Sequence, residues 1–406
     1  MFLRVTLPLS GGNFLNQAGR TVMAIVGPVL AVEFGLSASE LGLLAACMFA
    51  AYAAAQLPLG VALDTIGPRR LQTGLVLVAA AGFALFALSS SLTWFMVARV
   101  LIGVGISAGL MALIKANSLW FPPSRVAAMT GYAMAIASLG SVLVTTPVQW
   151  ALPILGWRGV FWGLAAISVA VAAWIWFAVS EKPGAVKRRS LKEEIAVMGS
   201  IFGSTKFWRY GPFPPLASLM NFVYMGLWAG PWMRDVAGFD GLARAQTLLG
   251  YTLAALVGSA FIGQWSSRMV AAGRSAFFVP VLCMAGVIAA QVGLVLQPTS
   301  VPVVVALWLA VAFFSAAGTT GYVAVGQLFP PEQTGRVSTA CNTLTLANAF
   351  LLQSAVGWIL DLFPRTASNG WAPEGYSWAL GLSIALQVLA ALNILGWKRP
   401  RRVAAD

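Results

Sequence analysis

The sequence has 406 residues, of which 59% are apolar and only 9% are charged. Soluble domains carry about 25% charged residues, so this composition excludes a soluble globular protein and indicates an integral membrane protein. A net charge of +13 would suggest nucleic acid as the partner of a soluble protein. Here most charges lie between apolar runs, so we interpret the excess as an orientation signal and a contact with anionic lipid, and expect no nucleic-acid partner.

Apolar runs of about 20 residues can each cross a hydrocarbon core of ~30 Å as a helix. We find twelve such runs and predict an all-α membrane protein with twelve transmembrane helices, the first of which is retained as a span. The predicted spans, in chain order, are 10–34, 40–63, 71–90, 94–119, 126–150, 158–180, 210–232, 244–267, 275–296, 302–328, 337–361 and 376–397.

The longest polar stretch divides these spans into six and six. It contains Ser190 and Glu193 at the S-x-x-E spacing of a capping box, which predicts a short amphipathic helix. WFPPSR at 120–125 and LFPPEQTGR at 328–336 follow the fourth and tenth spans, so the halves resemble repeats. We therefore predict two pseudo-symmetric six-helix bundles, with these segments in order: bundle 1–180, cytoplasmic loop 181–209, bundle 210–397 and basic tail 398–406.

The basic residues between spans predict the orientation. If both termini are cytoplasmic, eighteen lysines and arginines lie in cytoplasmic segments. Only four, Arg158, Arg234, Arg244 and Arg365, lie on the outer side. This asymmetry predicts a multi-pass protein of the inner (cytoplasmic) membrane with both ends in the cytoplasm.

The connection after the second span reads PLGVALDTIGPRR, residues 58–70. Gly60 would allow close helix packing, and Gly67 would permit a tight turn. Asp64 could accept hydrogen bonds from a neighbouring helix start or pair with a cation. Arg69 and Arg70 would hold the loop at the membrane surface. The alternative is a polar loop whose arginine pair serves orientation alone.

This loop resembles the signature of the major facilitator superfamily, G-x-x-x-D-[RK]-x-G-x-[RK]-[RK], with Thr65 where a basic residue is usual. RVLIGVG in the fourth span resembles a second motif of that family, carried by Arg99, Gly103 and Gly105. The resemblance implies two bundles around a central cavity that opens to each side in turn. It also implies that Asp64 and Arg69 latch the halves on the cytoplasmic side. The predicted conformational residues are Gly60, Asp64, Gly67, Arg69, Arg70, Arg99 and Gly103.

Arg20 is a charged residue near the middle of the first span. Asn13, Asn16, Gln17 and Arg20 follow i, i+3, i+4, i+7 spacing and form one polar stripe. A charge at the bilayer centre costs at least ~3 kcal/mol, and the nearest acid, Glu33, lies about 20 Å further along the helix. We predict that Arg20 contacts an anionic substrate. The alternative is an arginine neutralised by helix carbonyls or by a buried acid.

The spacing from Arg20 to Pro28 and on to Asp64 resembles the organophosphate and organic anion branch of the family, such as the glycerol-3-phosphate transporter. There a second arginine in the seventh span completes a phosphate clamp. The matching residue here is Val223, and a single guanidinium suits a carboxylate at least as well.

Polar and aromatic residues in other spans provide further candidates. These side chains could equally make interhelical hydrogen bonds, pack, or, for Lys115, extend to the membrane surface. The predicted substrate-binding set is Arg20, Gln17, Asn13, Lys115, Asn221, Tyr224, Trp228, Asn342 and Gln353.

The sequence contains no histidine, and we identify no nucleophile–base pair, metal cluster or nucleotide loop. We therefore predict neither an enzyme nor a bound cofactor or metal. Cys47, Cys283 and Cys341 lie in apolar runs and are expected to be small buried hydrophobes.

The leading hypothesis is a monomeric secondary carrier for a small organic anion, a carboxylate or a sugar-phosphate-like compound. A proton or counter-substrate could be coupled, but no acid lies at mid-span to carry a proton. Two other hypotheses remain open. One is an exporter of drug-like or siderophore-like compounds, and the other is a transporter-like receptor that does not transport.

Overall fold

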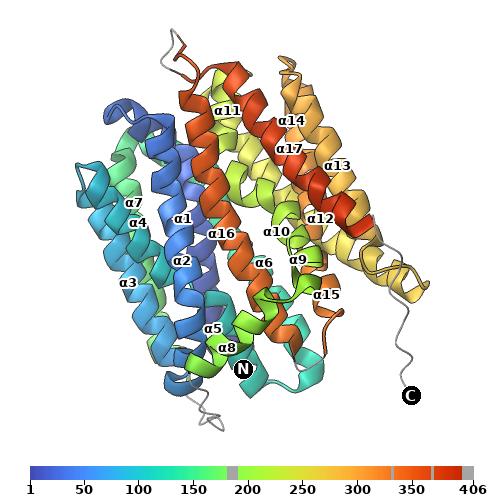
Figure 1. The fold of residues 1–406 in the computed structure, drawn as a ribbon. Helices are drawn as coiled ribbons and strands as arrows, with labels where there is room; N and C mark the ends of the chain where they lie inside the picture. The colour runs from blue at the N-terminus through green and yellow to red at the C-terminus, as the bar shows by residue number, and fades with distance from the viewer. Residues whose placement is uncertain (181–190, 331–332, 367–369, 396–406) are drawn as a thin grey trace.

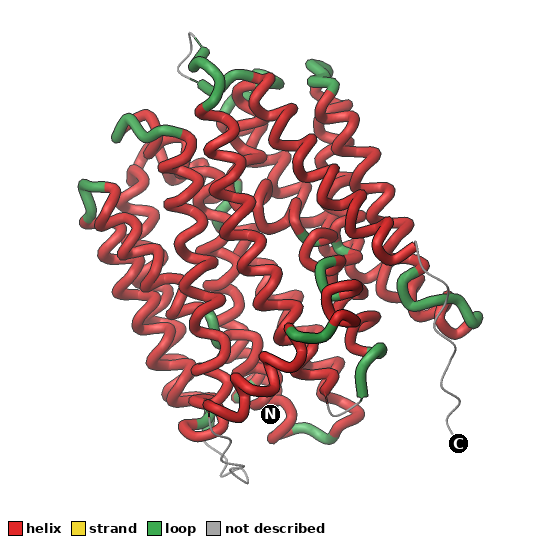
Figure 2. Tube along the Cα trace, viewed as in Figure 1, coloured by secondary structure: helices red, strands yellow, loops and turns green. Residues whose placement is uncertain are grey.

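The structure is a computed structural model that describes residues 1–180, 191–330, 333–366 and 370–395. Within these ranges the regular structure is helical, apart from an isolated bridge between Arg365 and Trp371. Ser190, half of the predicted capping box, and the predicted tail 398–406 lie outside the described residues. Loops gather at the two ends of a bundle of long helices (Figure 2).

The first half of the chain forms one helical bundle. It begins with the short η1 (Phe2–Arg4). The longer helices are α1 (Thr6–Glu33), α2 (Ala38–Ile66), α3 (Pro68–Leu88), α4 (Leu92–Ile106), α5 (Gly109–Trp120), α6 (Pro123–Leu143) and α7 (Thr146–Ala178). Helices α4 and α5 together make the fourth span. Gly156, at φ 63°, breaks α7 between the fifth and sixth spans.

The second half begins with α8 (Leu191–Phe202), an amphipathic helix that contacts α2 and α16. The chain continues through α9 (Thr205–Tyr210), α10 (Phe213–Ala217), the π-helix η2 (Met220–Trp228), α11 (Ala229–Asp235), α12 (Gly241–Ala271), α13 (Phe278–Val295), α14 (Val301–Ser315), α15 (Ala317–Gly326), α16 (Thr334–Asp361) and α17 (Pro373–Leu395). Helices α10, η2 and α11 follow one another as the seventh span.

Ten helical segments of the described chain are long and apolar enough to cross a membrane. The fifth span (α6 with the start of α7) and the seventh are the other two. The fifth contains a shorter apolar helix at Ala128–Leu143, and the seventh is broken into short helices. The prediction of an all-α fold of twelve spans is therefore confirmed, although the fifth span continues beyond its predicted end at residue 150.

The two halves lie side by side, with α2 and α16 adjacent over their lengths (Figure 1). We call the end of the bundle that holds Met1 and the end of α17 the terminal face. The opposite end, which holds Glu33 and Asp361, is the distal face. Because α2 runs toward the terminal face and α16 away from it, the two helices are antiparallel.

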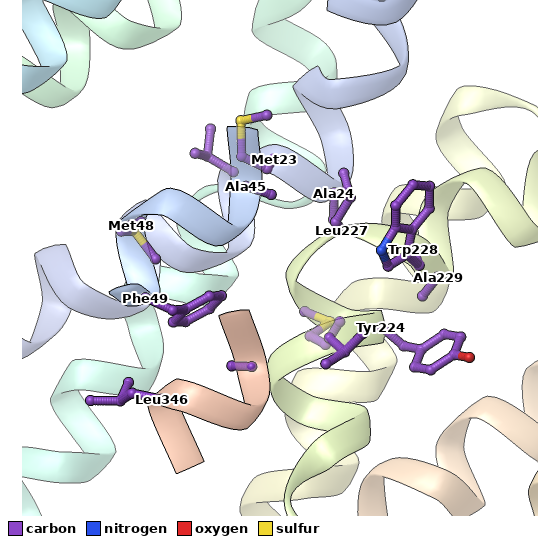
Figure 3. Close-up of a cluster of buried hydrophobic side chains, with 14 of the residues drawn as sticks. Met23, Ala24, Ala45, Met48, Phe49, Tyr224, Leu227, Trp228, Ala229 and Leu346 are labelled. Atoms are coloured by element: carbon purple, nitrogen blue, oxygen red, sulfur yellow. The ribbon is translucent and has the colours of Figure 1, made fainter. Parts of the chain in front are cut away.

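Buried apolar side chains join the halves between the middle of the bundle and the distal face. Ala24 of α1 lies near Leu227 and Trp228 of the second half (Figure 3), and a Cβ on Gly27 of α1 would lie 2.9 Å from a methyl carbon of Leu227. A Cβ on Gly230 would lie 2.4 Å from the carbonyl oxygen of Ala24, so only glycine permits this approach of α11 to α1. The halves are thus tightly packed in this region.

Candidate functional site

Arg20 lies midway along α1, half-buried where the first half of the chain meets the second. Its Nη1 donates a hydrogen bond to Oε1 of Gln17 over 3.1 Å. Its guanidinium carbon lies 3.9 Å from the ring centroid of Phe222 in η2. A cation over an aromatic face is stabilised most where water is excluded. These two contacts orient the arginine and leave its charge unneutralised.

Two tyrosine hydroxyls lie within electrostatic range of the guanidinium, that of Tyr52 on α2 and that of Tyr322 on α15. The Tyr52 hydroxyl accepts a hydrogen bond of 3.2 Å from Nδ2 of Asn16. The Tyr322 hydroxyl is hydrogen-bonded to the hydroxyl of Thr345 on α16. Neutral groups from α1, α2, α15 and η2 therefore lie around the cation, and of these the Gln17 amide and the two tyrosine hydroxyls can also hydrogen-bond a ligand.

Glu33 and Asp64, two acids of the first half, are paired with groups other than Arg20. Glu33 accepts hydrogen bonds from Nε1 of Trp157 (2.6 Å) and Nη1 of Arg158 (3.1 Å) at the distal face. Asp64 forms a 2.8 Å ion pair with Lys115 near the terminal face. Both acids therefore lie toward the ends of the bundle and bind groups of their own half.

Gln353 on α16 carries a buried amide with unused hydrogen-bonding capacity. Its side chain is 1% exposed, and neither its nitrogen nor its oxygen has a hydrogen-bond partner. A Cβ on Gly226 would lie 3.8 Å from this amide nitrogen and 3.8 Å from the carbonyl oxygen of Arg20. Leaving a buried amide unpaired costs about 1–3 kcal/mol, which is recovered when a ligand or an ordered water supplies the missing bonds.

The π-helix η2 shapes the second half's side of this region. Within η2, the Phe222 ring reaches the Arg20 guanidinium, and Gly226 faces the Gln353 amide. π-Helical segments are rare and occur frequently at functional sites. Next to this point, Phe222 and Val223 of η2 face Thr345 and Asn348 of α16 across a gap that has no room for a water molecule.

The structure brings some of the predicted substrate residues together. Gln17 holds Arg20, and Gln353 lies across Gly226 from the Arg20 backbone. Trp228 is fully buried, and its Nε1 donates a 3.1 Å hydrogen bond to the backbone oxygen of Gln353. Asn342 is half-buried on α16, three residues before Thr345.

Other predicted substrate residues make contacts elsewhere. Asn13 is buried within the first half, where a Cβ on Gly109 would lie 3.0 Å from its oxygen. Lys115 pairs with Asp64. Asn221 accepts a 2.7 Å hydrogen bond from Tyr251, and the Tyr224 hydroxyl lies 3.4 Å from that of Ser383. These four residues form hydrogen bonds or pack inside a single half, away from Arg20.

The three glycines predicted to act in conformational change differ in their backbone conformation and in how closely other helices approach them. Gly67 has φ 88°, which glycine adopts without strain, and it makes the predicted turn between α2 and α3. A Cβ on Gly103 would lie 2.3 Å from the Met48 carbonyl oxygen, so this glycine permits close packing of α4 on α2. The close packing expected at Gly60 is not seen, since no described atom outside its own helix lies within 4 Å of its Cβ position.

The charged members of the conformational set also lie within the first half. Nε of Arg69 donates to the backbone oxygen of Trp176 over 3.0 Å, and Arg69 stacks on that indole. Arg70 is exposed beside it. Arg99 is 1% exposed and donates to the carbonyl oxygens of Gly19, Leu44 and Ala45. In this conformation Asp64 and Arg69 thus bind groups of their own half.

Sequence reasoning missed three residues around Arg20: Tyr52, Phe222 and Tyr322. Tyr52 and Gln56 lie one turn apart in the apolar middle of α2, and this polar pair is a signal that could have identified Tyr52. Phe222 gives no such signal, because its place beside Arg20 depends on the π-helix and on how the halves dock.

Comparison with known proteins identifies the fold family. Residues 9–352 match the family model of the Major Facilitator Superfamily. A hexuronate transporter of Escherichia coli (strain K12) is 29% identical over 167 residues, 41% of this chain and 39% of that protein. An uncharacterized transporter of Bacillus subtilis (strain 168), YybO, is 28% identical over 186 residues, 46% of this chain and 42% of that protein. The matched regions span about two fifths of the length of the curated relatives.

The whole fold has a solved counterpart. A bacterial homologue of the human lysosomal transporter Spinster, in an inward-facing and occupied conformation, superposes with a TM-score of 0.79 at 17% sequence identity. The superposition covers 96% of this chain and 95% of that one. At this level of identity the likeness concerns the architecture of two six-helix bundles.

Proposed function

Because this chain belongs to the Major Facilitator Superfamily, we propose that it is a secondary carrier that moves a small organic anion by alternating access. In this proposal Arg20 is the counter-ion of the substrate. The observation that carries it is the setting of Arg20, a half-buried cation at the junction of the halves whose described partners are the neutral Gln17 and Phe222. An anion between the halves would neutralise the charge.

We propose a hydroxylated carboxylate as the substrate class. One guanidinium can hold one carboxylate through two parallel hydrogen bonds. Val223, at the place of the second arginine in phosphate carriers, is apolar and 1% exposed, which favours a carboxylate over a phosphate. The Tyr52 and Tyr322 hydroxyls and the unpaired Gln353 amide offer donors and acceptors for substrate hydroxyls. The relative named as a hexuronate transporter supports the same class.

We propose that the terminal face is cytoplasmic, because the basic residues between spans concentrate there. Segments 1–180 and 210–397 would be the two moving bundles, joined by 181–209 and followed by the tail 398–406. The other proposed partners are membrane lipid and a proton or counter-substrate, with the monomer as the transporting unit.

The first test measures the thermal stability of the purified carrier with galacturonate, with neutral galactose and with the lipophilic cation tetraphenylphosphonium. A ligand at 100 times its Kd adds ~2.7 kcal/mol to the stability of the folded state. We expect galacturonate to stabilise the wild type and not Arg20→Gln. Arg158→Gln is the matched control, since Arg158 pairs with Glu33 at the distal face.

Three results would count against the proposal. Stabilisation by the cation alone favours an exporter of drug-like compounds, and an equal response of Arg20→Gln assigns Arg20 a structural role. Binding of galacturonate without flux into liposomes favours a transporter-like receptor.

A further inference from the structure

The distal ends of α2 and α16 meet through a carboxylate that caps a helix of the other half. Oδ1 of Asp361, the last residue of α16, accepts a 2.9 Å hydrogen bond from the backbone nitrogen of Ala38. Oδ2 of Asp361 accepts one of 2.8 Å from the backbone nitrogen of Ser39. Ala38 and Ser39 belong to the first turn of α2, so Asp361 binds the positive end of that helix.

The start of α2 is only partly capped by its own residues. Ser37 and Glu40 form a capping box, in which each side chain accepts from the backbone nitrogen of the other residue. The nitrogens of Ala38 and Ser39 lie between these two and are bound by Asp361. The first turn of α2 therefore depends on both halves of the molecule for its hydrogen bonds.

Two further contacts join the two halves beside the start of α2. Nη2 of Arg365 donates a 2.6 Å hydrogen bond to the carbonyl oxygen of Leu36, just before α2. A Cβ on Gly357 would lie 2.4 Å from the Ala38 carbonyl oxygen, so the backbones touch one turn below Asp361. The polar contacts thus sit at the rim of a tightly packed helix pair.

We infer that Asp361 and Arg365 are a distal latch, which holds the distal ends of the two halves together and must release before the carrier can open there. The inference rests on the proposed function in one respect, because a distal opening is meaningful only for an alternating-access carrier. At the opposite end of α2, Asp64 is paired with Lys115 inside its own half. The carboxylate at the distal end of this helix pair is the one engaged across the interface.

The latch is well suited to reversible opening. Asp361 lies at the surface, so water can replace it at the Ala38 and Ser39 nitrogens when the halves separate. An exposed carboxylate at a helix N-terminus contributes only modestly to stability. The contact can therefore bias a conformational equilibrium without locking it.

The test measures a distance across the distal face by electron spin resonance. Spin labels on Ser90→Cys and Thr299→Cys, in a background without the native cysteines, report the separation of the α3–α4 and α13–α14 connections. Both positions are exposed and belong to different halves. In ligand-free Asp361→Ala we expect the ratio of distal-open to distal-closed molecules to rise about fivefold. Asp361→Asn, which keeps one acceptor oxygen, should give a smaller rise.

Asp240 provides a matched control. Its carboxylate also caps a helix at the distal face, accepting from the backbone nitrogen of Ala243 over 2.7 Å, but within the second half. Asp240→Ala should leave the distance distribution unchanged. Arg365→Gln is a second variant that weakens the latch by another route, in case Asp361→Ala does not fold.

The inference is overturned if folded Asp361 and Arg365 variants keep the wild-type distribution, or if Asp240→Ala shifts it equally. Since the distances are measured without ligand, they do not depend on Arg20 or on the identity of the substrate. The experiments can therefore disprove the distal latch without disproving the proposed substrate class, and the reverse also holds.

Discussion

Two arginines of the first half, Arg20 and Arg99, illustrate how a membrane protein accommodates a charge. Arg99 is enclosed by α1, α2 and α4 and uses its planar group to bind three backbone carbonyls. Arg20 lies at the junction of the halves with one neutral hydrogen-bond acceptor and one aromatic ring. Arg99 is stabilised by backbone carbonyls of its own half, whereas Arg20 retains the capacity to bind an anion.

The role of Arg99 can be tested with two substitutions. Arg99→Lys keeps the buried charge but cannot reach three carbonyls at once, so we expect it to lower the free energy of unfolding by about 3 kcal/mol. Arg99→Met removes the charge together with its bonds and should cost less, because the three carbonyls belong to helices. Thermal unfolding in detergent measures both variants. An Arg99→Lys variant as stable as wild type would contradict this account.

At the scale of elements, glycines determine how closely the helices pack. Gly103 and Gly105 lie on α4, where added Cβ atoms would come within 2.3 Å of Met48 of α2 and Ala79 of α3. The motif RVLIGVG therefore works as a packing surface on two sides of one helix. The sequence analysis expected close packing at Gly60, but no described atom outside its own helix lies within 4 Å of its Cβ position. The presence of a glycine in a sequence motif does not show whether the backbone of another helix packs against it.

A pair of substitutions tests this packing. Gly103→Ala should lower the free energy of unfolding by about 1–3 kcal/mol, because the methyl group collides with the Met48 carbonyl. Gly163→Ala in α7 is the control, since no atom lies within 4 Å of that Cβ position. The control should be unchanged or slightly more stable, as alanine favours a helix. Equal losses in both variants would show that helix flexibility, and not contact, matters at Gly103.

At the scale of the whole molecule, the charge pattern predicts how the bundle sits in its membrane. Cysteines placed at Ala272 on the terminal face and at Thr299 on the distal face are both exposed. With a membrane-impermeant maleimide on intact cells, we expect labelling of Thr299→Cys alone. Ala272→Cys should react only after the membrane is permeabilised. The reverse result would invert the orientation and would contradict the inference from the basic residues.

Much of the fold could be predicted from the sequence, because each span is a local property. Twenty apolar residues form a helix in lipid wherever they lie, since their backbone groups must bond within the segment. The exceptions are the interruptions inside predicted spans, the α4–α5 junction and the π-helix η2. Hydropathy does not record such interruptions, because the residues on both sides of them are equally apolar.

The candidate site was predictable only in part. Arg20 and Gln17 were found because a charge in an apolar run has no local explanation. Phe222 and Tyr322 could not be placed, because their proximity to Arg20 depends on how two halves of the chain dock. Similarly, Asp361 reads as an acid at a span end, and its hydrogen bonds to α2 join residues 322 and 323 positions apart.

The sequence by itself thus determined the membrane class, the number of spans and the presence of Arg20 as a charge with no local partner. These follow from composition and periodicity, which act over a few turns of helix. Only the tertiary structure decided which side chains share the space around Arg20 and which end of the bundle is closed. Those features depend on contacts between helices that are distant in the chain, and no local preference fixes them.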